Sequence, residues 1–494
     1  MLRWVAALLA LTFIRLMVAA VVPLAPDETY YWVWSHALAP GYLDHPPMVA
    51  FWIRTGTWIL GDTPVGVRLL GPLSAALGSV LLFDAAERLR PGTHRGAVAT
   101  ALLNATLLFG VGTIIMTPDT PLLFFWTASL WAAARLNETT NRRWWFALGL
   151  FAGLAMASKY TAALLWAGLA LWVVLIPRLR AEFRRAGPWL AAAVALAVFA
   201  PVIAWNARHG WASFLRQGGR TGDWHPARAL AFLAELIGGQ IGLATPLVFL
   251  VCVAGVVAAI RLAWKRRDEG AVLLGALTVP GALLFIQHAI GDRVQGNWPA
   301  ILYPAACIAA ASFVTARLRR LSSAAVWLGL ACTAVAYVEA MTGLLPVPPE
   351  RNPIDLQLSG WNALARRIEA MREATGATYV AADQYAVASE LAYIMMPPGV
   401  PVLGVDDRWS LFGLPRDAPN GPGLLIRGAA WPAPNEPGRW SQSVLVGEIR
   451  RGPVERFRLY LVTAGPDPPR FARLPRPASR DRTADQPQAR AQQD

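Results

Sequence analysis

A succession of long apolar segments constrains this chain more than any other feature. A helix needs about 20 predominantly apolar residues to cross a bilayer, and segments of that kind follow one another as far as residue 342. The candidate spans are 4–24, 64–84, 96–116, 120–136, 144–158, 161–177, 188–206, 236–260, 270–289, 298–316 and 322–342. The sequence therefore predicts an α-helical polytopic membrane protein with about eleven transmembrane helices.

The composition supports a membrane protein. Hydrophobic residues make up 55% of the chain and charged residues only 15%, whereas charged residues are about 25% of a soluble domain. The net charge of +14 could indicate nucleic-acid binding, but basic loops that fix membrane topology explain it better. The three cysteines lie inside apolar segments and indicate packing residues, with no disulfide or metal framework.

The basic residues also predict the orientation. Residues 4–24 resemble a signal peptide, but apolar residues continue past the weak cleavage signal at 18–20, so we interpret the segment as a retained anchor. With the N-terminus in the cytoplasm, the short loops rich in Arg face the cytoplasm, as the positive-inside rule requires. The C-terminal segment then lies outside.

This topology gathers ionisable residues from separate loops on the outer side. They are Asp27, Glu28, Asp44, His45, Asp119, Lys159, Asp292 and Arg293. An ionisable group at mid-bilayer costs at least about 2.5–3.5 kcal/mol, so their grouping at one face suggests a shared, water-accessible cavity. The alternative is that the ends of spans simply tolerate charge.

The first outer loop, 25–63, shows aromatic and apolar residues at helical spacing over 28–39 and 47–60. We expect two helices lying in the membrane interface. Asp27 opens the first helix and Asp44 precedes the second. Capping and the helix dipole alone would explain an acid at such a place.

The other outer loops carry further candidates, each with a structural alternative. Asp119 could cap a span, and Lys159 could extend harmlessly to the interface or meet a lipid phosphate. Arg293 is a candidate phosphate ligand. Loop 207–235 combines Arg with Trp, which suits sugar or phosphate contact, although a solvated loop explains it as well.

Beyond residue 344 the hydrophobicity stops. Residues 1–344 form the predicted membrane domain, 345–465 a small periplasmic α/β domain, and 466–494 a disordered tail rich in Pro, Arg, Gln and Asp. In the periplasmic domain we expect helices at 361–374 and 384–393, strands at 378–382 and 401–405, and a hairpin of 443–449 with 456–463.

Several chemistries lack their motifs. The sequence contains no phosphate loop for ATP-driven pumping and no His-Glu-x-x-His metalloprotease motif, and its six histidines show no ligand spacing. What remains is a set of acids, amines and aromatics at the outer face, beside apolar spans.

Such a set suits transfer of a sugar from a lipid phosphate to a hydroxyl, because nucleotide sugars are not generally available outside. Asp27 or Asp44 would take the proton of the acceptor, and one base without a covalent intermediate implies inversion. Lys159, Arg293 and His45 would stabilise the leaving phosphate. The substrate would be lined by residues of the first loop, namely Glu28, Tyr30, Tyr31 and Trp32.

At these residues the chain resembles the polytopic GT-C glycosyltransferases that use polyprenyl-phosphate sugars, a family 39-like group with protein O-mannosyltransferases and lipid A aminoarabinose transferases. The resemblance covers about residues 1–345. It is carried by Asp27-Glu28-x-Tyr30-Tyr31-Trp32, Asp44-His45-Pro46-Pro47, Thr117-Pro118-Asp119, Ser158-Lys159-Tyr160 and Asn297-Trp298-Pro299. Each motif alone is weak, and their order makes them specific.

The resemblance implies a GT-C membrane fold, a periplasmic domain over the active site, Asp27 as the catalytic acid and Asp119 as its support. It implies donor-phosphate binding by the motif that holds Asp44 and His45, although aminoarabinose transferases have Lys where this chain has His45. Some relatives involve a divalent cation and others do not, so the cofactor stays open.

Two other classes of function are alternatives to the transferase. A flippase for lipid-linked glycans would distribute charges along a path through the membrane, whereas here they gather at one face. A non-enzymatic envelope assembly subunit would act through the 345–465 domain. The expected partners of the transferase are a polyprenyl-phosphate-linked sugar and a hydroxyl acceptor on lipid A, another envelope glycan or a protein.

Overall fold

The computed structural model describes all residues except 1, 92–93, 220–223, 314–315, 395–396, 398, 435–438, 454, 466–469 and 478–494. The chain divides into two compact units. The first unit comprises Met1–Val18, Pro40–Val49 and Leu70–Tyr337, and the second comprises Ala19–Ala39, Ala50–Leu69 and Val338–Asp494.

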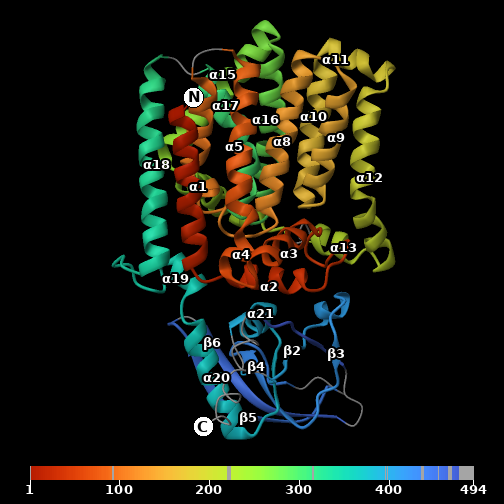
Figure 1. The fold of residues 1–494 in the computed structure, drawn as a ribbon, viewed down its shortest axis with the longest axis vertical. Helices are drawn as coiled ribbons and strands as arrows, with labels where there is room; N and C mark the ends of the chain where they lie inside the picture. The colour runs from red at the N-terminus through yellow and green to blue at the C-terminus, as the bar shows by residue number, and fades with distance from the viewer. Residues whose placement is uncertain are drawn as a thin grey trace, which may run out of the picture. The chain divides into compact units, whose positions relative to one another are not determined.

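The first unit is a helical bundle whose long helices run side by side (Figure 1). The helix α1 (Leu2–Val21) begins in this unit and α18 (Ala316–Thr342) ends outside it. The helices between them are α5 (Leu70–Leu89), α6 (Arg95–Asn104), α7 (Leu107–Gly110), α8 (Asp119–Glu138), α9 (Arg142–Met156), α10 (Ala163–Leu175), α11 (Pro177–Ala181), α12 (Gly187–Arg208), α13 (Ala212–Gly219), α14 (Ala229–Leu243), α15 (Pro246–Arg266), α16 (Glu269–His288) and α17 (Tyr303–Phe313). Short 3₁₀ turns lie at Tyr160–Ala162, Glu182–Arg184, Pro226–Arg228 and Trp298–Leu302.

Within the described residues, six helices are long and apolar enough to cross a membrane. They are Leu2–Val21, Pro64–Leu89, Gly187–Arg208, Pro246–Arg266, Glu269–His288 and Arg320–Thr342, and a bent pair at 160–184 would make a seventh. The predicted polytopic helical class is confirmed by these spans. Several of the other predicted spans coincide with shorter or more polar helices, and 96–116 is divided between α6, α7 and a turn.

Close helix packing in the first unit depends on small residues. A Cβ atom added to Gly149 of α9 would lie 2.3 Å from the carbonyl oxygen of Ala191 on α12. The same holds between α15 and α17, where a Cβ on Gly255 would lie 2.4 Å from the Ala310 nitrogen. Membrane helices commonly approach through small residues of this kind, since dispersion contacts drive their association.

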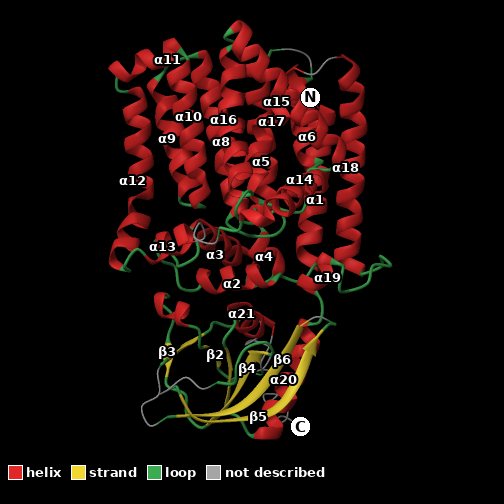
Figure 2. Cartoon of the chain, turned by 180° about the vertical axis from the view of Figure 1, so that it is seen from behind, coloured by secondary structure: helices red, strands yellow, loops and turns green. Residues whose placement is uncertain are grey.

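The second unit combines helices of the first outer loop with a mixed sheet. Its helices are α2 (Pro26–Ser35), α3 (Met48–Leu60), α4 (Pro64–Arg68), α19 (Pro353–Leu358), α20 (Trp361–Thr375) and α21 (Tyr385–Ile394), with a 3₁₀ turn at Asp407–Leu411. Its strands, drawn in yellow in Figure 2, are β1 (Tyr379–Ala382), β2 (Val402–Gly404), β3 (Arg416–Asp417), β4 (Pro422–Gly428), β5 (Trp440–Arg451), β6 (Glu455–Ala464) and β7 (Phe471–Arg473).

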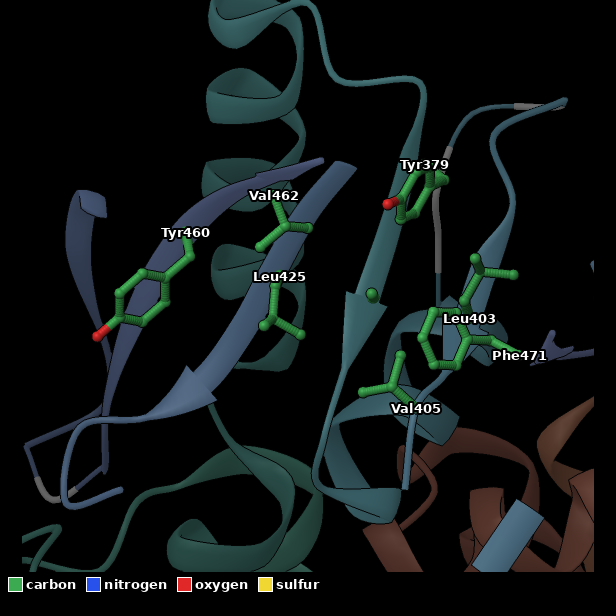
Figure 3. Packing of buried hydrophobic residues seen from close by; sticks show 8 residues of the cluster. Tyr379, Leu403, Val405, Leu425, Tyr460, Val462 and Phe471 are labelled. Carbon is green, nitrogen blue, oxygen red and sulfur yellow. The ribbon is translucent and has the colours of Figure 1, made fainter. Parts of the chain in front are cut away.

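The strand order is β3-β7-β2-β1-β4-β6-β5. The strand β1 is central and parallel to both β2 and β4, and every other pair is antiparallel. Every residue of β1 is buried, as expected of a parallel strand covered on both faces. Figure 3 shows the apolar core around it, formed by Tyr379, Leu403, Val405, Leu425, Tyr460, Val462 and Phe471.

Most elements of this unit follow the sequence prediction. The helices predicted at 28–39, 47–60, 361–374 and 384–393 form as α2, α3, α20 and α21, and the predicted hairpin forms as β5 and β6. The prediction of a disordered tail from 466 is wrong for Phe471–Arg473, which pairs with β2 and β3. The remainder of that tail from 478 lies outside the described residues.

The domain division also differs from the predicted boundary at residue 344. The structure groups most of the first outer loop with the C-terminal domain. The physical reason is aromatic packing, since Tyr30 of α2 contacts the rings of Tyr385, Trp409 and Phe412.

Candidate active site

Asp119 and Lys159 form an ion pair in the first unit. Asp119 opens α8, and Lys159 lies immediately before the turn Tyr160–Ala162. The ammonium of Lys159 donates to both carboxylate oxygens, at 2.7 and 2.8 Å. Asn297 donates from Nδ2 to Oδ2 of the same carboxylate at 2.7 Å. Three sequence motifs, 117–119, 158–160 and 297–299, therefore meet at one carboxylate.

A second ion pair holds the Asp44-His45-Pro46-Pro47 loop. Nε of Arg216, on α13, donates to Oδ1 of Asp44 at 2.7 Å, and the neighbouring Gln217 donates to the carbonyl of Asp44 at 2.5 Å. Asp44 is buried, whereas the Arg216 side chain is 42% exposed. His45, the next residue in this loop, is half-buried.

Hydrogen bonds join the segments that carry these two pairs. The N–H of Met48 donates to the carbonyl of Ala157 at 3.1 Å, so the 44–47 loop is bound to the end of α9 just before Lys159. On the other side of Lys159, the hydroxyl of Tyr160 lies 2.7 Å from that of Ser213 on α13. The cations Lys159 and Arg216 therefore belong to one hydrogen-bonded region of the first unit.

An apolar cavity of about 330 Å³ lies in the same unit, between α14, α15, α16 and α17. Its lining includes Leu236, Phe249, Val253 and Phe285, and Pro299 and Leu302 come from the turn that follows Asn297. Asn297, which binds Asp119, therefore lies two residues before Pro299 in the cavity lining. A hydrocarbon chain is the ligand that such a lining suits.

Asp27 belongs to the second unit, in the first turn of α2. Its side chain is exposed, and the hydroxyl of Tyr385, the first residue of α21, donates to Oδ1 at 3.3 Å. Asp27 is therefore an accessible carboxylate with a neutral donor beside it.

Glu28, adjacent in sequence, has the opposite environment. It is fully buried, and Arg68 of α4 donates to both its oxygens, at 2.7 and 2.5 Å. The N–H of Ala25 donates to the same carboxylate, and Arg68 also binds the carbonyls of Val22 and Pro23. The structure therefore corrects the predicted substrate-lining role of Glu28 to that of fixing the start of α2.

Tyr30, Tyr31 and Trp32 are corrected in the same way. Tyr30 is 2% exposed, Tyr31 6% and Trp32 0%. Trp32 donates from its indole to Asp62 at 2.8 Å and packs edge-on against Tyr393. Rings that are buried against their own unit cannot offer a face to a sugar, so we assign these aromatics to packing.

Arg293 does not join the Asp119 cluster. Its Nε donates to Glu235 at 2.7 Å, and its side chain is 64% exposed. Among the described residues, no hydrogen bond or ion pair connects it to Asp119 or Lys159. The position of an Arg at the end of a span does not determine which carboxylate it will pair with.

No group of three or more His, Cys, Asp or Glu side chains is placed to hold a metal ion within the part of the chain that the structure describes. The carboxylates of Asp44 and Asp119 are instead bound by Arg216 and Lys159.

Two residues that contact the candidate carboxylates were not singled out from the sequence. Arg216 was grouped with a solvated loop, although its position on a short helix beside Gln217 brings both to Asp44. Tyr385 carries no local signal at all, because it meets Asp27 from a position 358 residues away.

Comparison with known proteins supports the resemblance seen in the motifs. Residues 44–205 match the model of the dolichyl-phosphate-mannose-protein mannosyltransferase family. The lipid A galacturonosyltransferase RgtD of Rhizobium johnstonii is 29% identical over 290 residues, which are 58% of this chain and 59% of RgtD. An undecaprenyl phosphate-alpha-4-amino-4-deoxy-L-arabinose arabinosyl transferase of Pseudomonas paraeruginosa is 29% identical over 364 residues, 67% of this chain and 64% of that protein.

The alignments thus cover less than two thirds of either relative. The fold, in contrast, is matched along nearly the whole chain. The crystal structure of ArnT from Cupriavidus metallidurans bound to undecaprenyl phosphate superposes with a TM-score of 0.61 at 15% identity, covering 94% of this chain and 99% of ArnT. These matches show that the chain shares the fold of ArnT and is similar in sequence to named glycosyltransferases over part of its length.

Proposed function

We propose that this protein is an inverting membrane glycosyltransferase that moves a sugar from a polyprenyl-phosphate donor to a hydroxyl of an envelope acceptor, which is lipid A, another glycan or a protein. The observation that carries the proposal is the pairing of Lys159 with Asp119 and of Arg216 with Asp44 in one hydrogen-bonded region. Two oriented cations suit a phosphate, and the apolar cavity in the same unit suits a lipid tail. The names of the relatives, one of which acts from undecaprenyl phosphate, support the same donor class.

In this proposal Asp27 is the general base. Its carboxylate is exposed, and the hydroxyl of Tyr385 donates to it. Asp27 takes the proton of the acceptor hydroxyl as its oxygen attacks the anomeric carbon.

The bond from the anomeric carbon to the phosphate oxygen breaks in the same step, and the pair of electrons leaves with the polyprenyl phosphate. The charge on that phosphate increases in the transition state, so cations held in advance stabilise it. We assign this role to Lys159 and Arg216, with His45 beside them. Asp119 and Asp44 hold the two cations in place. Arg293, which binds Glu235, is not part of the proposed donor site.

The apolar cavity between α14 and α17 takes the part of the donor's tail nearest the phosphate. Its wall begins at Pro299, two residues after the Asn297 that binds Asp119. A cavity of about 330 Å³ holds several isoprene units, and the rest of the tail extends into the bilayer.

For the topology we propose eleven crossings, an N-terminus in the cytoplasm and an active site that faces the periplasm of a bacterial inner membrane. The basic loops support this orientation. A donor carried by a lipid also suits a compartment that lacks nucleotide sugars.

The experiment is sugar transfer in membrane vesicles that contain lipid-linked sugar, with the wild type and Asp27→Asn. Loss of a general base lowers kcat by about 10²–10⁴-fold, with donor binding retained. Glu448→Gln, which removes an exposed carboxylate on β5, is the matched control and keeps wild-type transfer. Transfer at the wild-type rate by a correctly inserted Asp27→Asn variant would refute the proposed base.

A further inference from the structure

Tyr385, in the C-terminal domain, contacts Asp27, the residue that we propose as the general base. It begins α21, and its hydroxyl donates to Oδ1 of Asp27 at 3.3 Å. Both residues belong to the second unit. The family match ends at residue 205 and begins at residue 44, so it includes neither of them.

The ring of Tyr385 is held from two sides. Its centroid lies 4.4 Å from that of Tyr30, which is three residues after Asp27 on α2. The guanidinium of Arg408, in the turn Asp407–Leu411, lies 4.3 Å from the centre of the Tyr385 ring. The same Arg408 donates to the hydroxyl of Tyr30 at 3.4 Å. Cation–π and aromatic contacts of this kind restrict the ring and therefore its hydroxyl.

A held hydroxyl affects an exposed carboxylate in two ways. It limits rotation of the carboxylate, which keeps one orientation ready for the acceptor. It also donates to the charged form and so favours the ionised carboxylate over the neutral acid. Both effects benefit a residue that must be ionised and correctly oriented before it can accept a proton.

We propose that Tyr385 is a positioning residue for Asp27, and that Arg408 and Tyr30 keep its hydroxyl in place. The C-terminal domain thereby contributes directly to the catalytic step. This inference rests on the proposed function, because it requires Asp27 to be the base.

The test compares the wild type with Tyr385→Phe in the vesicle transfer assay, as a function of pH. The variant retains the ring and loses only the hydroxyl. We expect kcat to fall by about five- to tenfold, while the KM for the lipid-linked donor stays within about twofold. The acidic limb of the kcat profile should move to higher pH by about half a unit, because the ionised carboxylate has lost a donor.

Tyr379→Phe is the matched control. It removes the hydroxyl of a buried tyrosine in β1 for which the structure shows no hydrogen-bond partner among the described residues. It should leave kcat and the acidic limb unchanged.

The outcomes separate this inference from the proposed function. An inactive Asp27→Asn variant together with a Tyr385→Phe variant of unchanged kcat and pH profile would overturn the role of Tyr385 and leave the base intact. A fully active Asp27→Asn variant would overturn the base itself. A lower melting temperature of Tyr385→Phe with an unmoved acidic limb would show a structural role only, and would also overturn the inference.

Discussion

Lys159 donates to both carboxylate oxygens of Asp119, and a third donor, Asn297, binds the same carboxylate. A bidentate, charge-assisted contact of this geometry orients the lysine strongly. Asp119 therefore fixes the position of the Lys159 ammonium, and we propose that it supports the site in this way.

The first prediction concerns this pair. Lys159→Ala should lower kcat/KM for the donor by about 10²-fold, because removing one preorganised donor to a developing charge has an effect of that order. Asp119→Asn should have a smaller effect in the same direction. The double variant should be little worse than Lys159→Ala alone, because Asp119 acts through Lys159. Additive losses, measured with purified protein and lipid-linked sugar, would contradict the assignment.

The second prediction concerns the other cation. Arg216→Ala should raise the KM for the donor by about tenfold with a smaller change in kcat, because Arg216 remains partly exposed and its attraction to a phosphate is screened. Arg208→Ala, which removes an exposed arginine at the end of α12, is the control and should keep the wild-type KM. Equal effects of the two variants would indicate a general loss of positive charge.

The third prediction concerns the buried ion pair of Glu28 and Arg68. Arg68→Met should destabilise the second unit by about 3–5 kcal/mol, because it leaves a buried carboxylate without its cation. Adding Glu28→Gln should restore part of that loss. Thermal unfolding in detergent measures both, and a double variant less stable than Arg68→Met would be evidence against the pair.

The fourth prediction is a pH dependence of stability. Glu390 of α21 is almost fully buried, and burial raises its pKa to about 8, with the hydroxyl of Thr29 as a partner. The folded state then binds a proton that the unfolded state loses above its ordinary pKa of 4.5. Stability from this group is therefore complete below pH 4.5 and is lost as the pH rises through about 8.

Glu390→Gln removes the titrating carboxyl and replaces it with an uncharged side chain of similar size and shape. We expect the variant to unfold at a higher temperature than the wild type at pH 9 and at a similar temperature at pH 4.5. Melting temperatures measured across that range test the assignment. A constant difference at every pH would show that the carboxyl does not titrate as described.

The fifth prediction concerns divalent cations. We propose that Lys159, Arg216 and His45 provide the positive charge at the donor phosphate, so transfer should persist in the presence of EDTA. The measurement is the transfer rate after dialysis against the chelator, with and without added Mg²⁺ or Mn²⁺. A rate restored only by a divalent ion would show that the cation is required.

Much of this architecture could be predicted from local patterns. The helices α2 and α3 were predicted because aromatic and apolar residues recur there at helical spacing. The β5–β6 hairpin was predicted because two segments rich in β-forming residues flank the turn Arg451-Gly452-Pro453. The strand β4, in contrast, was missed, because a short buried strand that begins with Pro422 has neither alternation nor a hairpin turn to mark it. The strand β7 was hidden in a segment whose composition resembles disorder.

The sequence by itself determined that charged residues gather at the ends of apolar spans, because a charged side chain inside the bilayer is energetically costly. It also determined which motifs resemble the glycosyltransferases. Only the tertiary structure decided the partners. Lys159 meets Asp119 and Arg216 meets Asp44, whereas Arg293 turns to Glu235 and the aromatics of α2 are buried. These pairings depend on how segments separated by tens to hundreds of residues pack together. Hydropathy and residue spacing describe local segments and do not determine that packing.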